Sequence, residues 1–237
     1  MRVLVTRPLP AAEATVRRLE AAGHQPILLP LMQATHLAAT AITALEVPHA
    51  AIVLTSAEAI RVLVSSDADL SQHLATPCFC VGAATAQAAA GLGFTDLRIA
   101  EGTGQSLAEL IGATIDTLPP LPLLYLAGTP RSEGLEMGLR QTGIEHRAVE
   151  CYRMEPIAHP RAAIEDLRRS NRPDAVLLYS RETARQFVRL LFEAGVDAAS
   201  FAPRYLCLSP VVAEALPGNV VAETAAKPDE DSLFSLL

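Results

Sequence analysis

Short apolar runs alternate along the chain with longer amphipathic stretches. The runs that predict strands are RVLVT (2–6), QPILLP (25–30), AAIVLT (50–55), PCFCVG (77–82), LPLLYLAG (121–128), DAVLLYS (174–180) and RYLCLS (204–209). Between them lie helical patterns such as the one from Ala11 to Ala22, which ends at Gly23, a residue type that commonly stops helices. Apolar strands alternating with helices indicate parallel sheets covered on both faces, because right-handed crossover connections place the helices there.

The later part of this pattern repeats the earlier part. The segment AAIVLTSAEAIRVLV (50–64) aligns with DAVLLYSRETARQFVRLL (174–191), and both predict a strand, a serine and a helix. PCFCVGAATAQAAAGLG (77–93) aligns with RYLCLSPVVAEALPG (204–218), and in both the strand turns directly into an Ala-rich helix. Self-similar units of this kind indicate two copies of one arrangement. We therefore expect an α/β protein with two similar doubly wound parallel-sheet domains.

Two extended segments interrupt the alternation, LPLMQATH (29–36) and HRAVECYRMEP (146–156). We interpret them as crossovers between the domains. Domain 1 is then discontinuous and contains residues 1–33 and 157–237, domain 2 contains residues 37–147, and residues 34–36 and 148–156 form a two-strand connector. A single boundary near residue 120 is the alternative interpretation, because sequence patterns define domain boundaries only loosely.

Composition narrows the class of protein. The chain has 237 residues, of which 50% are hydrophobic and 19% are charged, enough to build one large domain or two smaller ones with buried cores. The apolar runs fall short of a membrane span. The first run ends at Arg7 and Pro8, too soon for the core of a signal peptide. We therefore expect a cytoplasmic protein that has no membrane partner.

Charge and cysteine usage exclude further classes. The formal net charge of −7 argues against a nucleic-acid partner, since such proteins present a basic surface to the phosphates. Local arginines and helix N-termini can still hold an anionic small molecule. The four cysteines, Cys78, Cys80, Cys151 and Cys207, lack the paired spacing of a zinc or redox motif, so we interpret them as buried free thiols. The six histidines show no HxH or HxxxH pair, and we predict no metal site.

Several catalytic motifs are missing from the sequence. VTRP follows the first predicted strand, where a dinucleotide enzyme would have GxGxxG, and neither GxxxxGK[ST] nor GxSxG occurs. The segment EGTGQSL (101–107) is rich in glycine and leads into a predicted helix, but a lone GxG is more often a turn followed by a cap. These absences argue against dinucleotide enzymes and P-loop proteins.

Small polar residues and glycines follow the predicted strands, at the edge of a doubly wound sheet where ligands bind. The candidates for substrate binding are Thr6, Arg7, Thr55, Ser56, Gly82, Thr85, Gly128, Arg131, Ser180 and Ser209. Each Ser or Thr also suits the N-cap of a helix, which is the more frequent role of such a residue. The repetition favours a ligand, since helix N-termini that open toward one cleft from both domains would offer N–H groups to carboxylates or phosphates. The two arginines suit a solvated surface and an anion contact equally well.

Tyr152 lies in the second crossover segment, VECYRME, and not in a predicted helix. A tyrosine at a domain junction commonly packs there with its hydroxyl hydrogen-bonded. The functional alternative is a catalytic phenol that donates a proton to a leaving hydroxyl group.

Taken in order, VLVTRP, LTSAEAI, CVGAATAQAAAGLGF, LYLAGTPRSEGL, AVECYRMEP and LLYSRETARQF resemble uroporphyrinogen-III synthase over essentially the whole chain. Each motif alone has low specificity, but their order and spacing together are more specific. The resemblance implies two α/β domains joined by a two-strand connector, with domain 1 built from both chain ends. It also implies a lyase that removes water from hydroxymethylbilane, inverts ring D through a spiro intermediate and forms uroporphyrinogen III, without a metal or organic cofactor. A monomer is the default expectation.

The resemblance also implies roles for single residues. Tyr152 matches the family's crossover tyrosine and is the expected catalytic residue, which assists loss of the hydroxyl group. Thr85 matches the threonine of VGxxTA, and Thr55, Ser56 and Ser180 match polar positions at strand ends. Because the family has no indispensable acid or base, catalysis is expected mainly from substrate positioning. Substrate carboxylates and protein dipoles are expected to stabilise the azafulvenium cation.

One segment departs from the family pattern. The late element reads CLSPVVAEAL where IGxxTA is usual, with Ser209 in place of glycine and Val212 in place of threonine. Glycine lets the backbone approach a carboxylate closely, so that contact is in doubt at Ser209. Two other functions remain open: a non-enzymatic two-domain binding or sensor protein for a small polyanionic ligand, which needs no tyrosine, and a nucleotide-dependent transferase or reductase, which the missing phosphate loops weaken.

Overall fold

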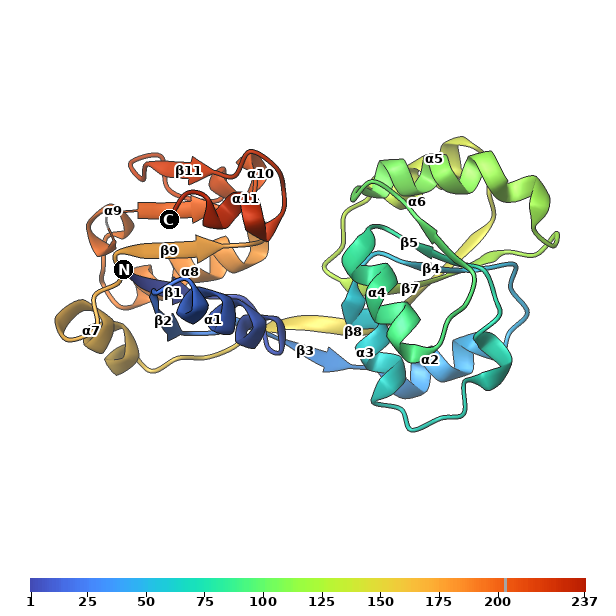
Figure 1. Ribbon diagram of the computed structural model, residues 1–237, viewed down its shortest axis with the longest axis horizontal. Helices are drawn as coiled ribbons and strands as arrows, with labels where there is room; N and C mark the ends of the chain where they lie inside the picture. Colours follow the sequence, from blue (N-terminus) through green and yellow to red (C-terminus); the bar gives the residue numbers. More distant parts are fainter. Residues whose placement is uncertain (203) are drawn as a thin grey trace. The chain divides into compact units, whose positions relative to one another are not determined.

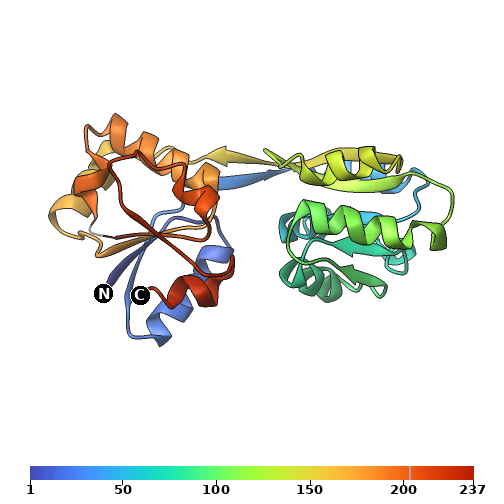
Figure 2. The same ribbon diagram turned by 90° about the horizontal axis from the view of Figure 1, so that it is seen from above.

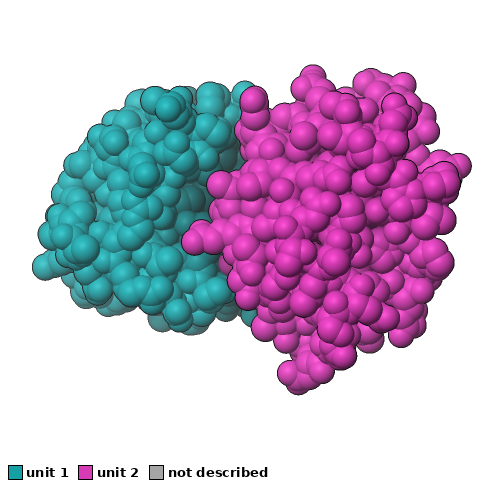
Figure 3. All heavy atoms as spheres, turned by 45° about the vertical axis from the view of Figure 1, so that its right-hand side comes forward, with its two compact units in different colours: residues 1–33, 155–237 teal, residues 34–154 magenta. Residues whose placement is uncertain are grey.

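The computed structural model describes residues 1–202 and 204–237, which form two compact units (Figures 1 and 3). Unit 1 comprises residues 1–33 and 155–237, and unit 2 comprises residues 34–154. The predicted connector segments lie in two strands, β3 (Met32–His36) and β8 (His146–Pro156). Each unit is an α/β structure, as the alternation of apolar runs predicted.

Unit 1 is built on a five-stranded sheet with the order β11-β10-β9-β1-β2. Its strands are β1 (Arg2–Val5), β2 (Gln25–Leu28), β9 (Ala175–Leu178), β10 (Arg204–Cys207) and β11 (Ala222–Thr224). All four strand pairings are parallel. Counted along the chain from β2, the order is 2-1-3-4-5, which is one of the common orders of doubly wound sheets.

Helices cover both faces of this sheet. One face packs against α1 (Ala11–Ala21) and α11 (Glu230–Phe234). The other face packs against α7 (Arg161–Arg169), α8 (Arg181–Glu193), α9 (Ala198–Phe201) and α10 (Pro210–Ala213). Successive side chains of a strand point to opposite faces, so Val3 and Val5 enter the first core and Leu4 enters the second. This double burial explains the unbroken apolar run in β1.

Unit 2 is built on a six-stranded sheet with the order β3-β8-β7-β4-β5-β6. Its remaining strands are β4 (Ile52–Leu54), β5 (Cys78–Cys80), β6 (Leu97–Ile99) and β7 (Leu123–Thr129). One face packs against α2 (Ala38–Leu45), α3 (Ala57–Val64) and α4 (Ala83–Leu92), and the other against α5 (Gly104–Thr114) and α6 (Gly134–Gln141) (Figure 2). Two short 3₁₀ helices, η1 (Ser71–His73) and η2 (Ile115–Thr117), complete the unit.

The two units share one spatial order of strands, although the two strands that come first along the chain in unit 1 correspond to the last two in unit 2. The order β2-β1-β9-β10-β11 of unit 1 corresponds to β8-β7-β4-β5-β6 of unit 2, and the helices between the strands correspond as well. The predicted repeat is therefore confirmed, with β4 and α3 matching β9 and α8. The later pair differs in length, because α10 has four residues and α4 has ten. Pro217 and Gly218 follow α10 closely and oppose a longer helix there.

Candidate functional site

In unit 2, predicted site residues gather where β4 and β7 end, beside the middle of β8. The pairing of β7 with β8 places Ala127 opposite Glu150 and Gly128 opposite Tyr152, so Cys151 is the extra residue of a β-bulge. A bulge re-aims the side chains that follow it. Here the ring of Tyr152 lies directly against the α-carbon of Gly128, and a β-carbon at position 128 would overlap the ring and its hydroxyl. Glycine at 128 is therefore what leaves room for the tyrosine.

Tyr152 is a buried phenol with 8% of its surface exposed. Burial raises its pKa above the ordinary value of 10.0, although a hydrogen bond with the Ser56 side chain acts in the opposite direction. The group is thus protonated at neutral pH and can serve as a proton donor. Ser56 has a second role as the N-cap of α3, where its Oγ accepts the N–H of Glu58 at 3.1 Å. The cap that the sequence predicted is confirmed.

Tyr125 belongs to the same group of hydroxyls, and sequence reasoning missed it. It lies on β7 with 1% of its surface exposed, and its hydroxyl is 2.9 Å from the Oγ1 of Thr55. Burial raises the pKa of Tyr125, while the Thr55 hydrogen bond and the charge of Arg131 lower it. The sequence did contain a signal for this contact, because Tyr125 carries the one side-chain hydroxyl of the predicted strand LPLLYLAG. A buried tyrosine hydroxyl usually has a hydrogen-bond partner. Thr55 supplies that partner and does not cap the helix.

Arg131 lies in the loop after β7 and is already paired. Its Nε donates to Oε1 of Glu136 at 2.6 Å, and this contact is the main cause that raises the pKa of Arg131. Glu136 also accepts a hydrogen bond from Arg140 at 3.4 Å. One donor of Arg131 is therefore already bonded to a carboxylate of α6, and fewer donors remain for the anion that the sequence suggested.

The N-terminus of α4 carries two further predicted residues. Gly82 is the N-cap residue and has no side chain to cap the helix, and its backbone is extended. Thr85 is the third residue of α4 and is 5% exposed. The first N–H groups of a helix have no partner within the helix, so this end offers donors to an anion.

Three predicted residues of unit 1 hold the local structure. Thr6 is fully buried, and its hydroxyl donates to the carbonyl of Leu177 at 2.8 Å, which ties the end of β1 to β9. Ser180 caps α8 by accepting the N–H of Thr183 at 3.1 Å. Ser209 is the N-cap residue of α10, but its side chain makes no capping hydrogen bond to that helix.

Arg7 follows β1 and contacts residues that sequence reasoning did not single out. Its Nη1 donates to Glu230 at 3.0 Å and to Thr15 at 3.1 Å. Its guanidinium carbon lies 4.2 Å from the centroid of the Tyr179 ring. Glu230 belongs to the C-terminal helix α11, far from Arg7 in the sequence, which is why no local pattern indicated the pair.

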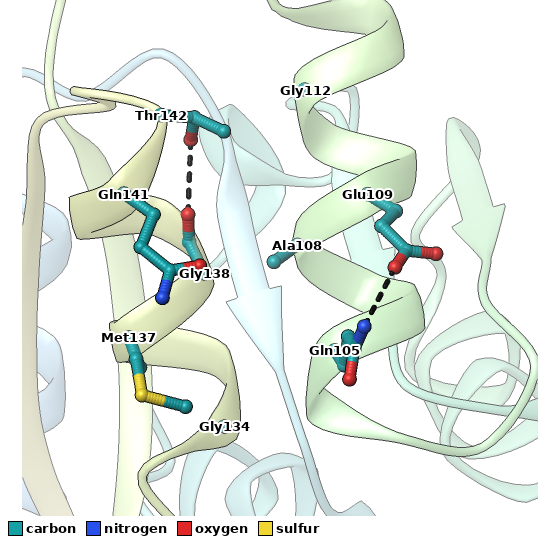
Figure 4. Close-up of a pocket in the computed structure, with 9 residues that line it drawn as sticks. All are labelled: Gln105, Ala108, Glu109, Gly112, Gly134, Met137, Gly138, Gln141 and Thr142. Carbon is teal, nitrogen blue, oxygen red and sulfur yellow. Dashed lines mark hydrogen bonds between the residues drawn. The ribbon is translucent and has the colours of Figure 1, made fainter.

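A hollow of about 540 Å³ lies between α5 and α6 of unit 2 (Figure 4). Four of its lining residues are small, and a β-carbon at Gly138 would stand 2.6 Å from that of Ala108. Along α5, Gln105 donates to Glu109 at 3.0 Å (Figure 4). None of the predicted site residues lines this hollow, and Glu109 is the one ionisable group in its lining.

The four cysteines are buried free thiols, as predicted. Over residues 1–202 and 204–237, no group of three or more His, Cys, Asp or Glu side chains is placed to hold a metal ion. Within the same residues, none of the helices combines the length and the apolar character needed to cross a bilayer.

The fold and these strand-end groups define a two-unit, doubly wound α/β protein with hydroxyl, phenol and arginine side chains at the carboxyl ends of its parallel strands. The sequence model of the family described as uroporphyrinogen-III synthase HemD matches residues 13–235. The chain belongs to the uroporphyrinogen-III synthase family. The resemblance inferred from its motifs is confirmed.

Solved structures show the same fold. Uroporphyrinogen-III synthetase from Helicobacter pylori has a TM-score of 0.67 and 15% identity, and the match covers 100% of this chain and 98% of that one. A mutant uroporphyrinogen III synthase from the extremely thermophilic bacterium Thermus thermophilus has a TM-score of 0.59 and 19% identity, with coverage of 100% and 95%. A search among curated proteins gave no match. Family membership makes the chain an enzyme of tetrapyrrole synthesis.

Proposed function

We propose that this chain is a lyase that converts hydroxymethylbilane into uroporphyrinogen III, by dehydrative cyclisation with inversion of ring D. The observation that carries the proposal is the family match over residues 13–235. The buried, protonated Tyr152 supports it, because a proton donor assists loss of the substrate hydroxyl group as water.

The proposed first step breaks the carbon–oxygen bond of the hydroxymethyl group. The phenol of Tyr152 donates its proton to the leaving oxygen, which departs as water and leaves an azafulvenium cation. Ring D then attacks through its substituted carbon, forms the spiro intermediate and rearranges. The final loss of a proton restores the aromatic pyrrole and returns a proton to the Tyr152 phenolate. Tyr125 shapes this region by holding Thr55, and Ser56 bonds to Tyr152 itself.

The rest of the catalytic effect is proposed to come from holding the substrate. Every pyrrole of the substrate carries an acetate and a propionate group, so N–H donors and arginines suit it. We propose that the N-terminus of α4 at Gly82 and Thr85 and the side chain of Arg7 bind these carboxylates. We propose Arg131, Ser180 and Ser209 as further substrate contacts. Thr6, Thr55 and Gly128 support the site through their contacts with neighbouring residues.

We further propose that the enzyme acts as a monomer in the cytoplasm, with the linear tetrapyrrole as its small-molecule partner and no nucleic-acid partner. The net charge of −7 supports the last part of this proposal, because a nucleic acid would be repelled.

The test is conversion of freshly generated hydroxymethylbilane, with chromatographic separation of the isomer I and isomer III products. Isomer III in excess over the isomer I that forms spontaneously is the expected result. If well-folded protein and verified substrate give isomer I alone, the catalytic proposal is wrong and a binding protein for a polyanionic ligand becomes the better interpretation.

A further inference from the structure

Glu230 collects hydrogen bonds from four side chains of unit 1. Its Oε1 accepts from Arg7 at 3.0 Å, from Thr15 at 2.6 Å and from Tyr179 at 2.6 Å. Its Oε2 accepts from Arg18 at 2.6 Å. These donors come from the loop after β1, from α1 and from the end of β9, so one carboxylate of the C-terminal helix joins three separate parts of the unit.

Arg7 is held in one orientation by this group. Its guanidinium lies over the Tyr179 ring, 4.2 Å from the centroid, and the Tyr179 hydroxyl bonds to the same carboxylate oxygen as the arginine. Within the described residues, Nη1 is the guanidinium nitrogen that makes hydrogen bonds, to Glu230 and Thr15. The donors on Nη2 and Nε therefore remain for another acceptor. The side chain is 26% exposed, which leaves it accessible to a ligand.

An arginine held in this way binds an anion at lower entropic cost. A free arginine side chain carries about 2 kcal/mol of rotamer entropy, part of which is lost whenever it is immobilised on a ligand. Arg7 has already lost this entropy on folding, because the Tyr179 ring, the Glu230 carboxylate and the Thr15 hydroxyl fix its guanidinium. Its remaining donors form a planar edge, which suits a carboxylate.

The shared fold does not require this ionic cluster. In unit 2, Thr55 occupies the position of Tyr179, and α5 begins with Gly104 where α11 begins with Glu230. There, α5 and α6 pack through small residues such as Ala108 and Gly138. The arginine after the equivalent strand of unit 2, Arg131, pairs with Glu136 of α6 and not with a residue of α5. The shared fold therefore does not require a carboxylate on the helix that corresponds to α11.

We propose that Glu230 and Tyr179 are positioning residues, which hold the Arg7 guanidinium in the orientation that binds a carboxylate of the substrate. The inference rests on the proposed function, since it assigns the source of the carboxylate to the linear tetrapyrrole. Glu230 acts through Arg7 and does not itself touch the substrate.

Glu230→Gln tests the proposal against the matched control Asp231→Asn. Both variants remove one negative charge from α11, but Asp231 pairs only with Arg18 among these arginines, and its side chain is 87% exposed. We expect Glu230→Gln to raise KM for hydroxymethylbilane about fivefold to tenfold, as loss of a charge-assisted hydrogen bond implies, with kcat within about twofold. Asp231→Asn is expected to leave both parameters within about twofold.

Two further variants show whether the effect passes through Arg7. In an Arg7→Ala background, Glu230→Gln is expected to add no further rise in KM, because interacting residues are not additive. Tyr179→Phe removes one hydrogen bond but keeps the ring, so it remains informative if Glu230→Gln folds poorly, and its expected rise in KM is about twofold to threefold. An unchanged or lower KM in Glu230→Gln, or an effect that persists without Arg7, overturns the proposal.

Binding of uroporphyrin III separates this inference from the proposed function. This polycarboxylate is the oxidised form of the product, and fluorescence quenching measures its affinity without turnover. Weaker binding to Glu230→Gln than to Asp231→Asn is expected, again by about fivefold to tenfold. Wild-type protein that forms isomer III while both variants bind uroporphyrin III equally would contradict the inference and leave the function intact. Absence of isomer III together with weaker binding of uroporphyrin III to Glu230→Gln would contradict the function and keep Arg7 as a preformed contact for a tetrapyrrole carboxylate.

Discussion

The two units have the same strand order, but the side chains at their strand ends differ in chemistry. After β4 of unit 2 the chain reads Thr55-Ser56, and after the matching β9 of unit 1 it reads Tyr179-Ser180. The serine caps the following helix in both units. The residue before it bonds to a neutral phenol in unit 2 and to the carboxylate Glu230 in unit 1. The units thus share the helix cap, which the fold needs, and differ in the chemistry beside it.

This difference suggests separate tasks for the two units. Unit 2 presents buried, neutral hydroxyl groups around Tyr152, which suit proton donation. Unit 1 presents Arg7 in an ionic cluster, which suits a carboxylate. We expect substitutions in unit 2 to change mainly kcat and substitutions in unit 1 to change mainly KM.

The largest effect is expected from Gly128→Ala. A methyl group at position 128 would overlap the Tyr152 ring, so the tyrosine must leave its place or the strand must shift. We expect kcat to fall about 100-fold or more and the free energy of unfolding to fall by about 1–3 kcal/mol. Isomer III formation and urea denaturation measure the two changes. Normal activity in this variant would show that the position of Tyr152 over Gly128 does not matter.

Tyr152→Phe isolates the hydroxyl group from the ring. The ring still packs against Gly128, so we expect little change in stability, whereas loss of the proton donor lowers kcat about 100-fold. Ser56→Ala is the accompanying control, because it removes a hydrogen-bond partner of Tyr152 but leaves the donor. A kcat for Tyr152→Phe equal to that of wild type would assign the whole catalytic effect to substrate positioning.

The alkaline titration of Tyr152 sharpens the description of unit 2. Burial raises the pKa of the folded-state phenol above 10.0, so the group keeps its proton where an exposed tyrosine would have lost half of it. The difference in tyrosinate absorbance between wild type and Tyr152→Phe is expected to have its midpoint above pH 10. A midpoint at or below this value would mean that the phenol is not buried as described.

The ionic cluster of unit 1 predicts a smaller, pH-dependent effect on stability. Burial raises the pKa of Glu230, but hydrogen bonds from Thr15 and Tyr179 and the charge of Arg7 lower it overall below the ordinary value of 4.5. A lowered folded-state pKa stabilises the protein above pH 4.5, and the contribution is lost as pH falls through the lowered value. We expect Glu230→Gln to reduce the free energy of unfolding by about 1–2 kcal/mol at pH 7. The difference from wild type should vanish in acid, and a difference that is constant with pH would contradict this explanation.

The smallest effect is expected from the shared helix caps. Ser180→Ala and Ser56→Ala each remove a hydrogen bond to a helix N-terminus, at 3.1 Å in both units. Each also removes a second side-chain hydrogen bond, from Ser180 to Thr183 at 2.9 Å and between Ser56 and Tyr152. Each is expected to cost about 1 kcal/mol of stability, measured by thermal or urea unfolding. Equal losses would support the common role of the two serines, whereas a much larger loss at one position would show that its serine has an additional structural role.

Much of the fold could be predicted from the sequence, because buried parallel strands leave unbroken apolar runs such as those in β1 and β7. The repeat could be aligned for the same reason. The edge strands β6 and β11 were missed, since each has three residues and is only partly buried or exposed, which leaves no continuous apolar signal. The Ala-rich helix predicted after β10 is present but has only four residues, with Pro217 and Gly218 close behind it.

The candidate site was only partly predictable. Caps such as Ser56 and Ser180 are local features, and a sequence pattern can indicate them. The overlap of Tyr152 with Gly128 depends on the bulge at Cys151, and register shifts of this kind leave no clear trace in the sequence. The contact of Arg7 with Glu230 joins residues that are 223 positions apart. Only the folded chain brings such groups together.

Steady-state kinetics of Tyr152→Phe and Glu230→Gln, measured side by side on hydroxymethylbilane with isomer III as the product, tests the difference between the units most directly. The expected result is a lower kcat with little change in KM for Tyr152→Phe, and a higher KM with little change in kcat for Glu230→Gln. If both variants alter the same parameter, or if their parameters are exchanged, the two units do not have the separate tasks that their strand ends indicate.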